Sequence, residues 1–163
     1  MNWWLLFGII STTVSLDLLS KEVLATKFHL GQSIPLVPGI LNLVHVRNKG
    51  VAFGLLSHPS VSWLLPYLGV LLIVGLILFL FYLRPKGKMA ITSMGLTIGG
   101  AIGNLYDRLY LKEVRDFFDL HIGSYHWPAF NVADTAITIG AILFLLHVVR
   151  SKDDDKKMVS KGS

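Results

Sequence analysis

The sequence predicts an all-α integral membrane protein with four transmembrane helices. Hydrophobic residues make up 53% of the 163 positions and charged residues only 15%. The mean hydropathy of +0.60 is too high for an ordinary soluble domain of this size. Four apolar runs are each long enough to cross the hydrocarbon core of a bilayer, which is roughly 30 Å thick. We treat these runs and the segments between them as one domain over residues 1–152.

The composition also excludes several classes of site and partner. The chain has no cysteine, which excludes disulfides, thiolate metal sites and a cysteine nucleophile. Its six histidines lack the paired spacing of metal-binding motifs, so we predict neither a metal nor a cofactor. The formal charge of +5 comes from basic residues at loop ends, which indicate membrane topology rather than a nucleic-acid-binding face.

Residues 3–24 form the first apolar run, which we interpret as a retained transmembrane helix. No basic segment precedes it and no small-residue cleavage site follows, unlike in a cleaved signal peptide. Asp17 and Lys21 interrupt the run four residues apart. This spacing places both side chains on one face of a helix, where they can pair.

Residues 26–59 have a different character, because glycine and proline interrupt them repeatedly. The β-prone stretch 41–46 predicts short strands. Open strand edges are not tolerated in lipid, so we place this outer segment outside the bilayer core.

A short basic loop separates the next two runs. Residues 63–83 carry no charge, and the basic loop 84–88 follows them. Residues 89–110 are rich in glycine, which lets helices approach closely. This third run ends on a polar stretch that contains Asn104, Asp107 and Arg108.

The last part of the chain is predicted to form a loop, a helix and a tail. We expect an outer loop over residues 111–127 and the fourth transmembrane helix over residues 128–149, with Pro128 in its first turn. The polar tail 153–163 is expected to be disordered and in part a cloning remnant. Four spans place both termini on the side of the basic loop 84–88, and the positive-inside rule makes that side cytoplasmic.

Polar residues from three of these helices are expected at one depth. At about 1.5 Å per residue, Asp17 and Asn104 lie about 21 and 22 Å from the cytoplasmic edge. Asp134, on a helix that runs the other way, also lies at about 21 Å. Asp116 can fold back toward them from the segment 111–127. We therefore predict one shared site just below the outer membrane surface.

Asp116 and Asp134 are the best catalytic candidates. An ionisable residue in an apolar run is costly and indicates a functional site. Two neighbouring carboxylates do not both ionise easily, so one keeps a proton near neutral pH. The ionised carboxylate can take a proton from water while the protonated one polarises a scissile carbonyl. No serine lies in the Gly-x-Ser-x-Gly setting of a nucleophile.

The remaining polar residues are interpreted as support for this pair. Asp107 and Arg108 could form a buried ion pair that holds helices together. Asn104 and Asn131 each lie three residues before an aspartate, so we expect them to orient carboxylates or to cap backbone groups.

Five blocks of the sequence together resemble the motifs of bacterial lipoprotein signal peptidase, also called signal peptidase II. They are Asp17-Leu-Leu-Ser-Lys21, Asn48-Lys-Gly-Val-Ala-Phe53, Gly99-Gly-Ala-Ile-Gly-Asn-Leu-Tyr-Asp-Arg108, Val114-Arg-Asp-Phe117 and Phe130-Asn-Val-Ala-Asp134. The blocks follow the family's order across nearly the whole chain except the tail.

The resemblance implies an aspartic endopeptidase of the bacterial cytoplasmic membrane. Such an enzyme removes the signal peptide of a diacylglyceryl-modified prolipoprotein by cutting just before the lipidated cysteine. Asp116 and Asp134 match the catalytic dyad. The substrate-binding or supporting positions match at Asp17, Lys21, Asn48, Gly50, Asn104, Asp107, Arg108 and Asn131.

The resemblance also implies an outer architecture and a set of partners. Residues 26–59 match a small extracytoplasmic β-sheet cradle, and the segment before Pro128 matches a periplasmic loop or helix that covers the substrate. The implied partners are the prolipoprotein signal peptide, membrane lipid and cyclic peptide antibiotics, without nucleic acid, and we expect a monomer.

Two residues depart from the family's pattern. Leu18 stands where the family usually has glutamine, and Arg115 stands where it usually has an apolar residue. Arg115 could lower the pKa of Asp116 or reach a lipid phosphate.

Two other functions are open to such a chain. A small proton-coupled transporter subunit would use the intramembrane charges as a relay. The cytoplasmic halves of the predicted spans lack Asp, Glu, Lys and Arg for such a path, and the chain shows no internal repeat. A non-catalytic membrane scaffold predicts that Asp116 and Asp134 tolerate asparagine.

Overall fold

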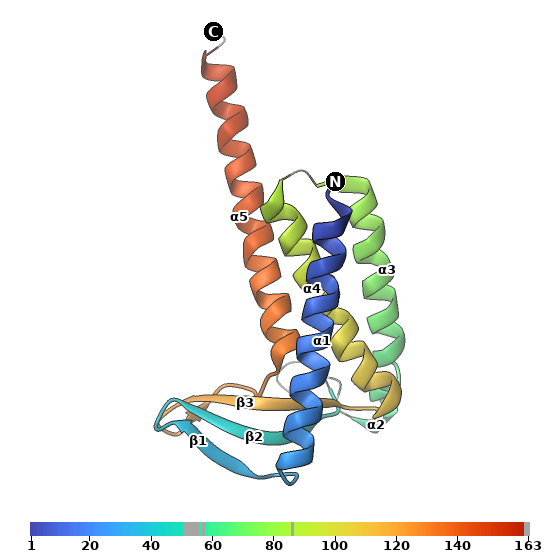
Figure 1. The fold of residues 1–163 in the computed structure, drawn as a ribbon, viewed down its shortest axis with the longest axis vertical. Helices are drawn as coiled ribbons and strands as arrows, with labels where there is room; N and C mark the ends of the chain where they lie inside the picture. Colours follow the sequence, from blue (N-terminus) through green and yellow to red (C-terminus); the bar gives the residue numbers. More distant parts are fainter. Residues whose placement is uncertain (51–55, 57, 86, 162–163) are drawn as a thin grey trace.

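The computed structural model describes residues 1–50, 56, 58–85 and 87–161, in which four long helices stand side by side with a small sheet across one end (Figure 1). The long helices are α1 (Trp3–Lys27), α3 (Leu65–Leu83), α4 (Lys88–Tyr110) and α5 (Val132–Lys161). The short helix α2 (Pro59–Ser62) precedes α3 at the sheet end of the bundle. Both chain termini lie away from the sheet, as the prediction of an even number of spans requires.

The sheet has four antiparallel strands in the order β1-β2-β3-β4. They are β1 (Ser33–Val37), β2 (Leu41–Asn48), β3 (Val114–Ile122) and β4 (Tyr125–His126). The strands predicted within residues 26–59 are therefore confirmed. The prediction of a loop over residues 111–127 is wrong, because β3 pairs with β2 and places Asp116 opposite Val46.

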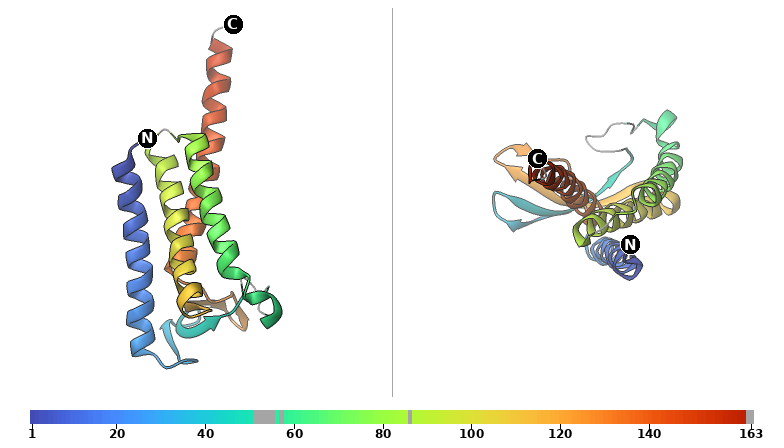
Figure 2. Two further views of the ribbon diagram at one scale, coloured as in Figure 1. Left: turned by 90° about the vertical axis from the view of Figure 1, so that its right-hand side faces the viewer. Right: turned by 90° about the horizontal axis from the view of Figure 1, so that it is seen from above.

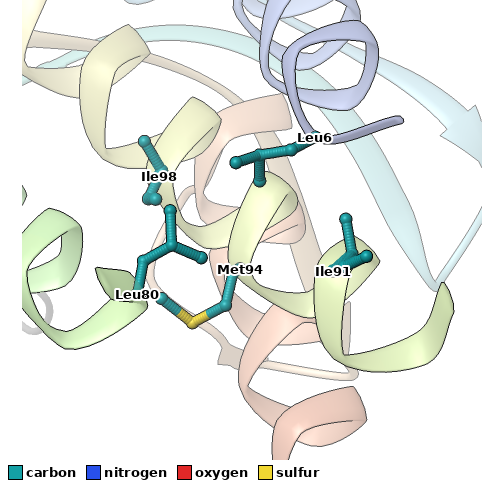
Figure 3. Close-up of a cluster of buried hydrophobic side chains, with 5 residues drawn as sticks. All are labelled: Leu6, Leu80, Ile91, Met94 and Ile98. Carbon is teal, nitrogen blue, oxygen red and sulfur yellow. The ribbon is translucent and has the colours of Figure 1, made fainter. Parts of the chain in front are cut away.

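Helix α4 is the centre of the bundle and packs against α1, α3 and α5 (Figure 2). A buried apolar cluster joins α4 to α1 and α3 at the end away from the sheet (Figure 3). Its members are Leu6, Leu80, Ile91, Met94 and Ile98. Apolar contacts therefore hold the helices together at this end. The buried charged residues Asp17, Lys21 and Asp107 lie nearer the sheet.

The distribution of side chains is that of a membrane protein. Large apolar side chains cover the outside: Leu71 is 68% exposed and Leu145 is 64% exposed. Charged Asp17, Lys21 and Asp107 are instead fully buried inside the bundle. Lipid favours apolar groups outside and paired polar groups inside.

Three described segments are long and apolar enough to cross a membrane. They are Trp3–Lys27, Pro59–Leu83 and Val132–Ser151. The predicted third span, residues 89–110, forms α4, which is not one of the three although it has 23 residues. The glycines and polar residues of α4 lower its mean hydropathy. Two of these polar residues, Ser93 and Asn104, are buried against the other helices.

Both ends of α5 differ from the prediction. The helix begins at Val132 rather than at Pro128, because Phe130 forms a β-bridge with Phe118 and keeps the chain extended as far as Asn131. At its other end α5 continues to Lys161. The expectation of a disordered tail is therefore wrong for the described residues up to 161.

Gly100 lets α4 and α5 approach closely, and its replacement gives a first prediction. A Cβ at this position would lie 2.5 Å from the backbone oxygen of Ala133, whereas a Cβ at Gly75 would meet nothing within 4 Å. We expect Gly100→Ala to lower the free energy of unfolding by about 1–3 kcal/mol. Gly75→Ala, on α3, should keep or raise stability because alanine favours helix. Melting temperatures in one detergent compare the two variants, and equal shifts would contradict the close approach.

Candidate active site

Asn131 and Asp134 cap each other at the beginning of α5. The backbone N–H of Asp134 donates to Oδ1 of Asn131 at 3.0 Å, and the backbone N–H of Asn131 donates to Oδ2 of Asp134 at 3.2 Å. This reciprocal arrangement satisfies N–H groups that a helix leaves open at its start. The sequence Asn-Val-Ala-Asp therefore starts the helix and fixes Asp134 in its first turn.

The same asparagine links Asp134 to Asp116 of β3. The Nδ2 of Asn131 donates to Oδ1 of Asp116 at 2.7 Å. Phe117 and Phe118, which follow Asp116, donate backbone N–H groups to the carbonyl of Phe130 at 3.0 and 2.9 Å. These hydrogen bonds hold β3 against the residues just before α5. They bring together Asp116 and Asp134, the two aspartates predicted from the sequence.

Burial raises the pKa of Asp116 to about 7, and the negative charge of Asp134 nearby acts in the same direction. Hydrogen bonds from the Asn131 and Asn48 side chains and the positive charge of Lys21 act in the opposite direction. Asp116 is only 2% exposed, so removal from water dominates. Its carboxyl group therefore keeps a proton at pH values where an ordinary aspartate is ionised.

Lys21 connects α1 to the second aspartate. Its ammonium donates to Oδ2 of Asp17 at 2.7 Å and to Oδ1 of Asn104 at 3.0 Å. The amide of Asn104 in turn donates to Oδ1 of Asp134 at 2.7 Å. Oδ1 of Asp17 accepts the backbone N–H of Ala133 at 2.9 Å, which ties α1 to α5. The predicted pairing of Asp17 with Lys21 is confirmed.

Asp107 does not form the suggested ion pair with Arg108. Its carboxylate accepts hydrogen bonds from Nη2 and Nε of Arg115 at 2.8 and 3.2 Å, and it lies 3.5 Å from Nζ of Lys21. Nη1 of Arg115 binds Oε2 of Glu22 at 3.0 Å. Arg115 therefore reaches into the protein rather than toward a lipid phosphate. Successive residues of a helix point about 100° apart, so Asp107 and Arg108 serve different sides of α4.

Arg108 lies on the side of α4 that faces the dyad. Its Nη2 donates to the carbonyl of Gly50 at 3.1 Å, and its charge is within electrostatic range of Asp116 and Asp134. Asn48 accepts the backbone N–H of Gly50 at 2.9 Å and hydrogen-bonds to Asp116. The end of β2 is thereby held beside the carboxylates.

All of the site residues predicted from the sequence therefore belong to one group at the sheet end of the bundle. Hydrogen bonds join α1, α4, α5 and β3 at this group, so the predicted side chains meet, and their depth in the membrane stays a prediction. Sequence reasoning missed Glu22 and the inward contacts of Arg115. The one signal for Arg115 was its departure from an apolar family pattern.

The chain is similar to proteins of one named family along almost its whole length. The family model for Signal peptidase (SPase) II matches residues 9–150. A lipoprotein signal peptidase from Maridesulfovibrio salexigens is 42% identical over 156 residues, which cover 93% of this chain and 100% of that protein. A lipoprotein signal peptidase from Aquifex aeolicus is 42% identical over 159 residues, which cover 97% of this chain and 93% of that protein.

Solved structures agree with these similarities. A bacterial membrane enzyme solved by the in meso method at 2.3 Å resolution has a TM-score of 0.81 and 30% identity, covering 91% of this chain and 90% of that chain. A second one, solved by the same method at 1.9 Å resolution, has a TM-score of 0.76 and 31% identity, covering 88% of this chain and 91% of that chain.

Proposed function

Because the chain belongs to the signal peptidase II family of proteases, we propose that it is a membrane-embedded aspartic endopeptidase acting on diacylglyceryl-modified prolipoproteins. It removes the signal peptide by cutting the peptide bond on the N-terminal side of the lipidated cysteine. The observation that carries this mechanism is the link from Asp116 through Asn131 to Asp134.

The unequal surroundings of the two aspartates support a division of roles. The pKa of Asp116 is raised to about 7 by burial and by the charge of Asp134, so we assign it the shared proton at neutral pH. Both oxygens of Asp134 accept N–H hydrogen bonds, one from the Asn104 side chain and one from the Asn131 backbone. Asp134 is then the carboxylate that accepts a proton from water.

The chemistry follows from these roles in two steps. Asp134 takes a proton from a water molecule, whose oxygen attacks the scissile carbonyl carbon, while Asp116 gives its proton to the carbonyl oxygen. The product is a neutral gem-diol. Asp116 then takes back a hydroxyl proton as the C–N bond breaks, and Asp134 gives its proton to the leaving nitrogen. Both aspartates return to their starting states, and one water molecule is consumed.

We place four transmembrane segments in the bacterial inner membrane, namely the three apolar segments and α4. Helix α4 has 23 residues and stands side by side with the three apolar segments (Figures 1 and 2). Arg84 and Lys88 lie at the end of the bundle that carries both termini, which supports a cytoplasmic location for that end. The sheet and the dyad then face the outer side.

The position of the dyad suits a substrate anchored by lipid. The aspartates lie where the long helices meet the sheet, just inside the outer end of the bundle. A diacylated cysteine keeps its acyl chains in the outer leaflet, so a site at this depth reaches the adjacent peptide bond without extracting them. Cyclic peptide antibiotics that act on this family are expected to compete for the same place, and we expect the enzyme to work as a monomer.

One experiment tests the proposed function. Purified protein in detergent is given a diacylated prolipoprotein or the same precursor without lipid, and the products are identified by mass spectrometry. We expect a single cut before the lipidated cysteine and much slower cleavage of the unlipidated precursor. No cleavage of the diacylated substrate would contradict the function, and equal cleavage of both would contradict the argument from depth.

The raised pKa of Asp116 predicts how activity depends on pH. Asp116 must be protonated to act as the acid, and it ionises as the pH rises through about 7. The rate constant kcat/KM should therefore fall by about tenfold per pH unit well above this value. The measurement is a profile from about pH 5.5 to pH 9 in one detergent, with the melting temperature recorded at each pH. A rate that still rises at alkaline pH in folded protein would exclude Asp116 as the acid.

A further inference from the structure

Arg115 contacts residues that hold each of the two catalytic candidates, Asp116 and Asp134. We propose that Arg115 is a positioning residue that fixes the location of Asp116 relative to Asp134. This inference rests on the proposed function, because it assigns a role in the same reaction. Arg115 touches neither carboxylate of the pair in this structure, so its effect passes through its partners.

The first part of the evidence is the way Arg115 anchors β3. Its backbone N–H and its Nε both donate to Oδ2 of Asp107, at 3.0 and 3.2 Å, and its Nη2 donates to Oδ1 at 2.8 Å. Its Nη1 reaches Glu22 of α1 at 3.0 Å. Arg115 is 7% exposed and Asp107 is fully buried, so the charge-assisted bonds between these two residues are shielded from water, whereas the side chain of Glu22 is 70% exposed. The residue directly before Asp116 is therefore fixed to two helices.

Two chains of hydrogen bonds lead from Arg115 to the dyad. In the first, its carbonyl oxygen accepts from Nδ2 of Asn131 at 3.3 Å, and the same Nδ2 donates to Asp116 at 2.7 Å. The amide that orients Asp116 is thus itself held by the backbone of Arg115.

The second chain reaches the other aspartate through α4 and α1. Asp107, which binds Arg115, lies 3.5 Å from the ammonium of Lys21. Lys21 donates to Asn104 at 3.0 Å, and Asn104 donates to Asp134 at 2.7 Å. Without the guanidinium, Lys21 would be the remaining cation beside Asp107 and would be drawn away from Asn104. Loss of Arg115 therefore disturbs both aspartates.

An arginine suits this position better than a lysine. The planar guanidinium binds both oxygens of Asp107 and still reaches Glu22, whereas an ammonium is a point charge that cannot span the carboxylate in this way. Arg115→Lys keeps the positive charge and removes the planar group that binds both oxygens of Asp107. The comparison of the two residues therefore separates geometry from charge.

The chain offers a matched control on the neighbouring strand. Arg47 of β2 lies directly opposite Arg115 in the antiparallel register. Like charges in such a pair repel unless each has its own partner. Arg47 is paired at 2.6 Å with Glu113, and its side chain is 39% exposed. Arg47→Met thus removes the same chemical group from the same sheet without touching the supports of the dyad.

The test compares kcat, KM and the pH profile of Arg115→Met, Arg115→Lys and Arg47→Met on a diacylated prolipoprotein. We expect Arg115→Met to lower kcat by roughly 10- to 100-fold, because small displacements of catalytic groups are costly. KM should stay within about threefold of the wild-type value, because the substitution changes the position of the aspartates and not a contact with the substrate. Arg115→Lys should recover part of the loss, and Arg47→Met should keep the wild-type kcat.

The pH profile separates positioning from a simple loss of charge. The groups that act on Asp116 are Asp134 of α5, Lys21 of α1, and the Asn48 and Asn131 amides, and Arg108 of α4 also lies within electrostatic range. A looser pair admits water and weakens the repulsion between carboxylates, which lowers the pKa of Asp116. The alkaline limb of Arg115→Met should therefore move to lower pH by about half a unit or more. A shift to higher pH would indicate loss of a nearby positive charge and would overturn the positioning role.

The remaining outcomes are also decisive. A role limited to stability predicts a lower melting temperature but an unchanged kcat and pH profile for the folded fraction, and that result would overturn the inference. If Arg115→Met does not fold, Arg115→Lys decides: a lower kcat at unchanged KM supports positioning, and a wild-type kcat overturns it. Wild-type protein that leaves the diacylated substrate intact overturns the proposed function itself, and the positioning role with it.

Discussion

Replacing either Asp116 or Asp134 with asparagine should lower kcat by at least about 10³-fold. Asparagine keeps the size and much of the hydrogen bonding, so Asn131 can still contact both positions. It can neither accept the proton of water nor hold a proton for the carbonyl oxygen. The measurement is the cleavage rate of a diacylated prolipoprotein by each purified variant.

Asp119→Asn is the matched control for these variants. Asp119 lies on β3 with Asp116, but its carboxylate pairs with Asn42 at 3.0 Å and with His126 at 2.9 Å, away from the dyad. We expect it to keep the wild-type rate. Full cleavage activity in Asp116→Asn or Asp134→Asn would show that the two aspartates are not the catalytic pair.

Asp116→Asn should at the same time make the protein more stable in alkaline solution. The pKa of Asp116 is raised from 3.8 to about 7 in the folded protein, so between these values the folded state holds a proton that the unfolded state has lost. Stability therefore falls as the pH rises through this window, and the full cost is present above it. The gain in melting temperature on Asp116→Asn should be larger at about pH 8 than at about pH 4.

Replacing Lys21 with methionine should prevent the protein from folding stably. Lys21 is fully buried, and its ammonium lies 2.7 Å from Asp17 and 3.5 Å from Asp107. Removing one member of a buried charge group leaves uncompensated charge and costs about 3–5 kcal/mol. We expect most of the variant to be lost from the monodisperse fraction after extraction in detergent.

Lys27→Met is the control for that variant, because Lys27 is exposed in the last turn of the same helix. It should behave like the wild type. The double variant Lys21→Met with Asp17→Asn removes both charges of the pair and should recover part of the folded protein. Wild-type stability in Lys21→Met alone would show that the buried charges are not coupled as the distances indicate.

Contacts set by helix geometry were predictable from the sequence. Asp17 and Lys21 lie four residues apart, so helix α1 brings them together whatever surrounds it. Asn131 and Asp134 lie three residues apart, and they meet because Asn131 directly precedes α5 and caps its first turn. The meeting of Asp17, Asn104 and Asp134 was predictable for a related reason, since every residue of a helix advances the chain by the same rise.

Contacts that depend on other elements were not predictable in this way. Asn104 lies three residues before Asp107 but turns to Asp134 of α5 instead. Asp107 finds Arg115 because β3 pairs with β2, a partner far away in the sequence. Strand β3 itself was missed because Asp116 interrupts its apolar residues, and the reason for that aspartate lies in the site rather than in the strand.

The shared proton of the dyad can be observed directly by infrared difference spectroscopy of the purified protein during a pH titration. We predict a protonated carboxyl group that persists at neutral pH, disappears as the pH rises through about 7, and is absent from Asp116→Asn. If the wild-type and Asp116→Asn spectra are the same at neutral pH, Asp116 holds no such proton and the two-aspartate mechanism is contradicted.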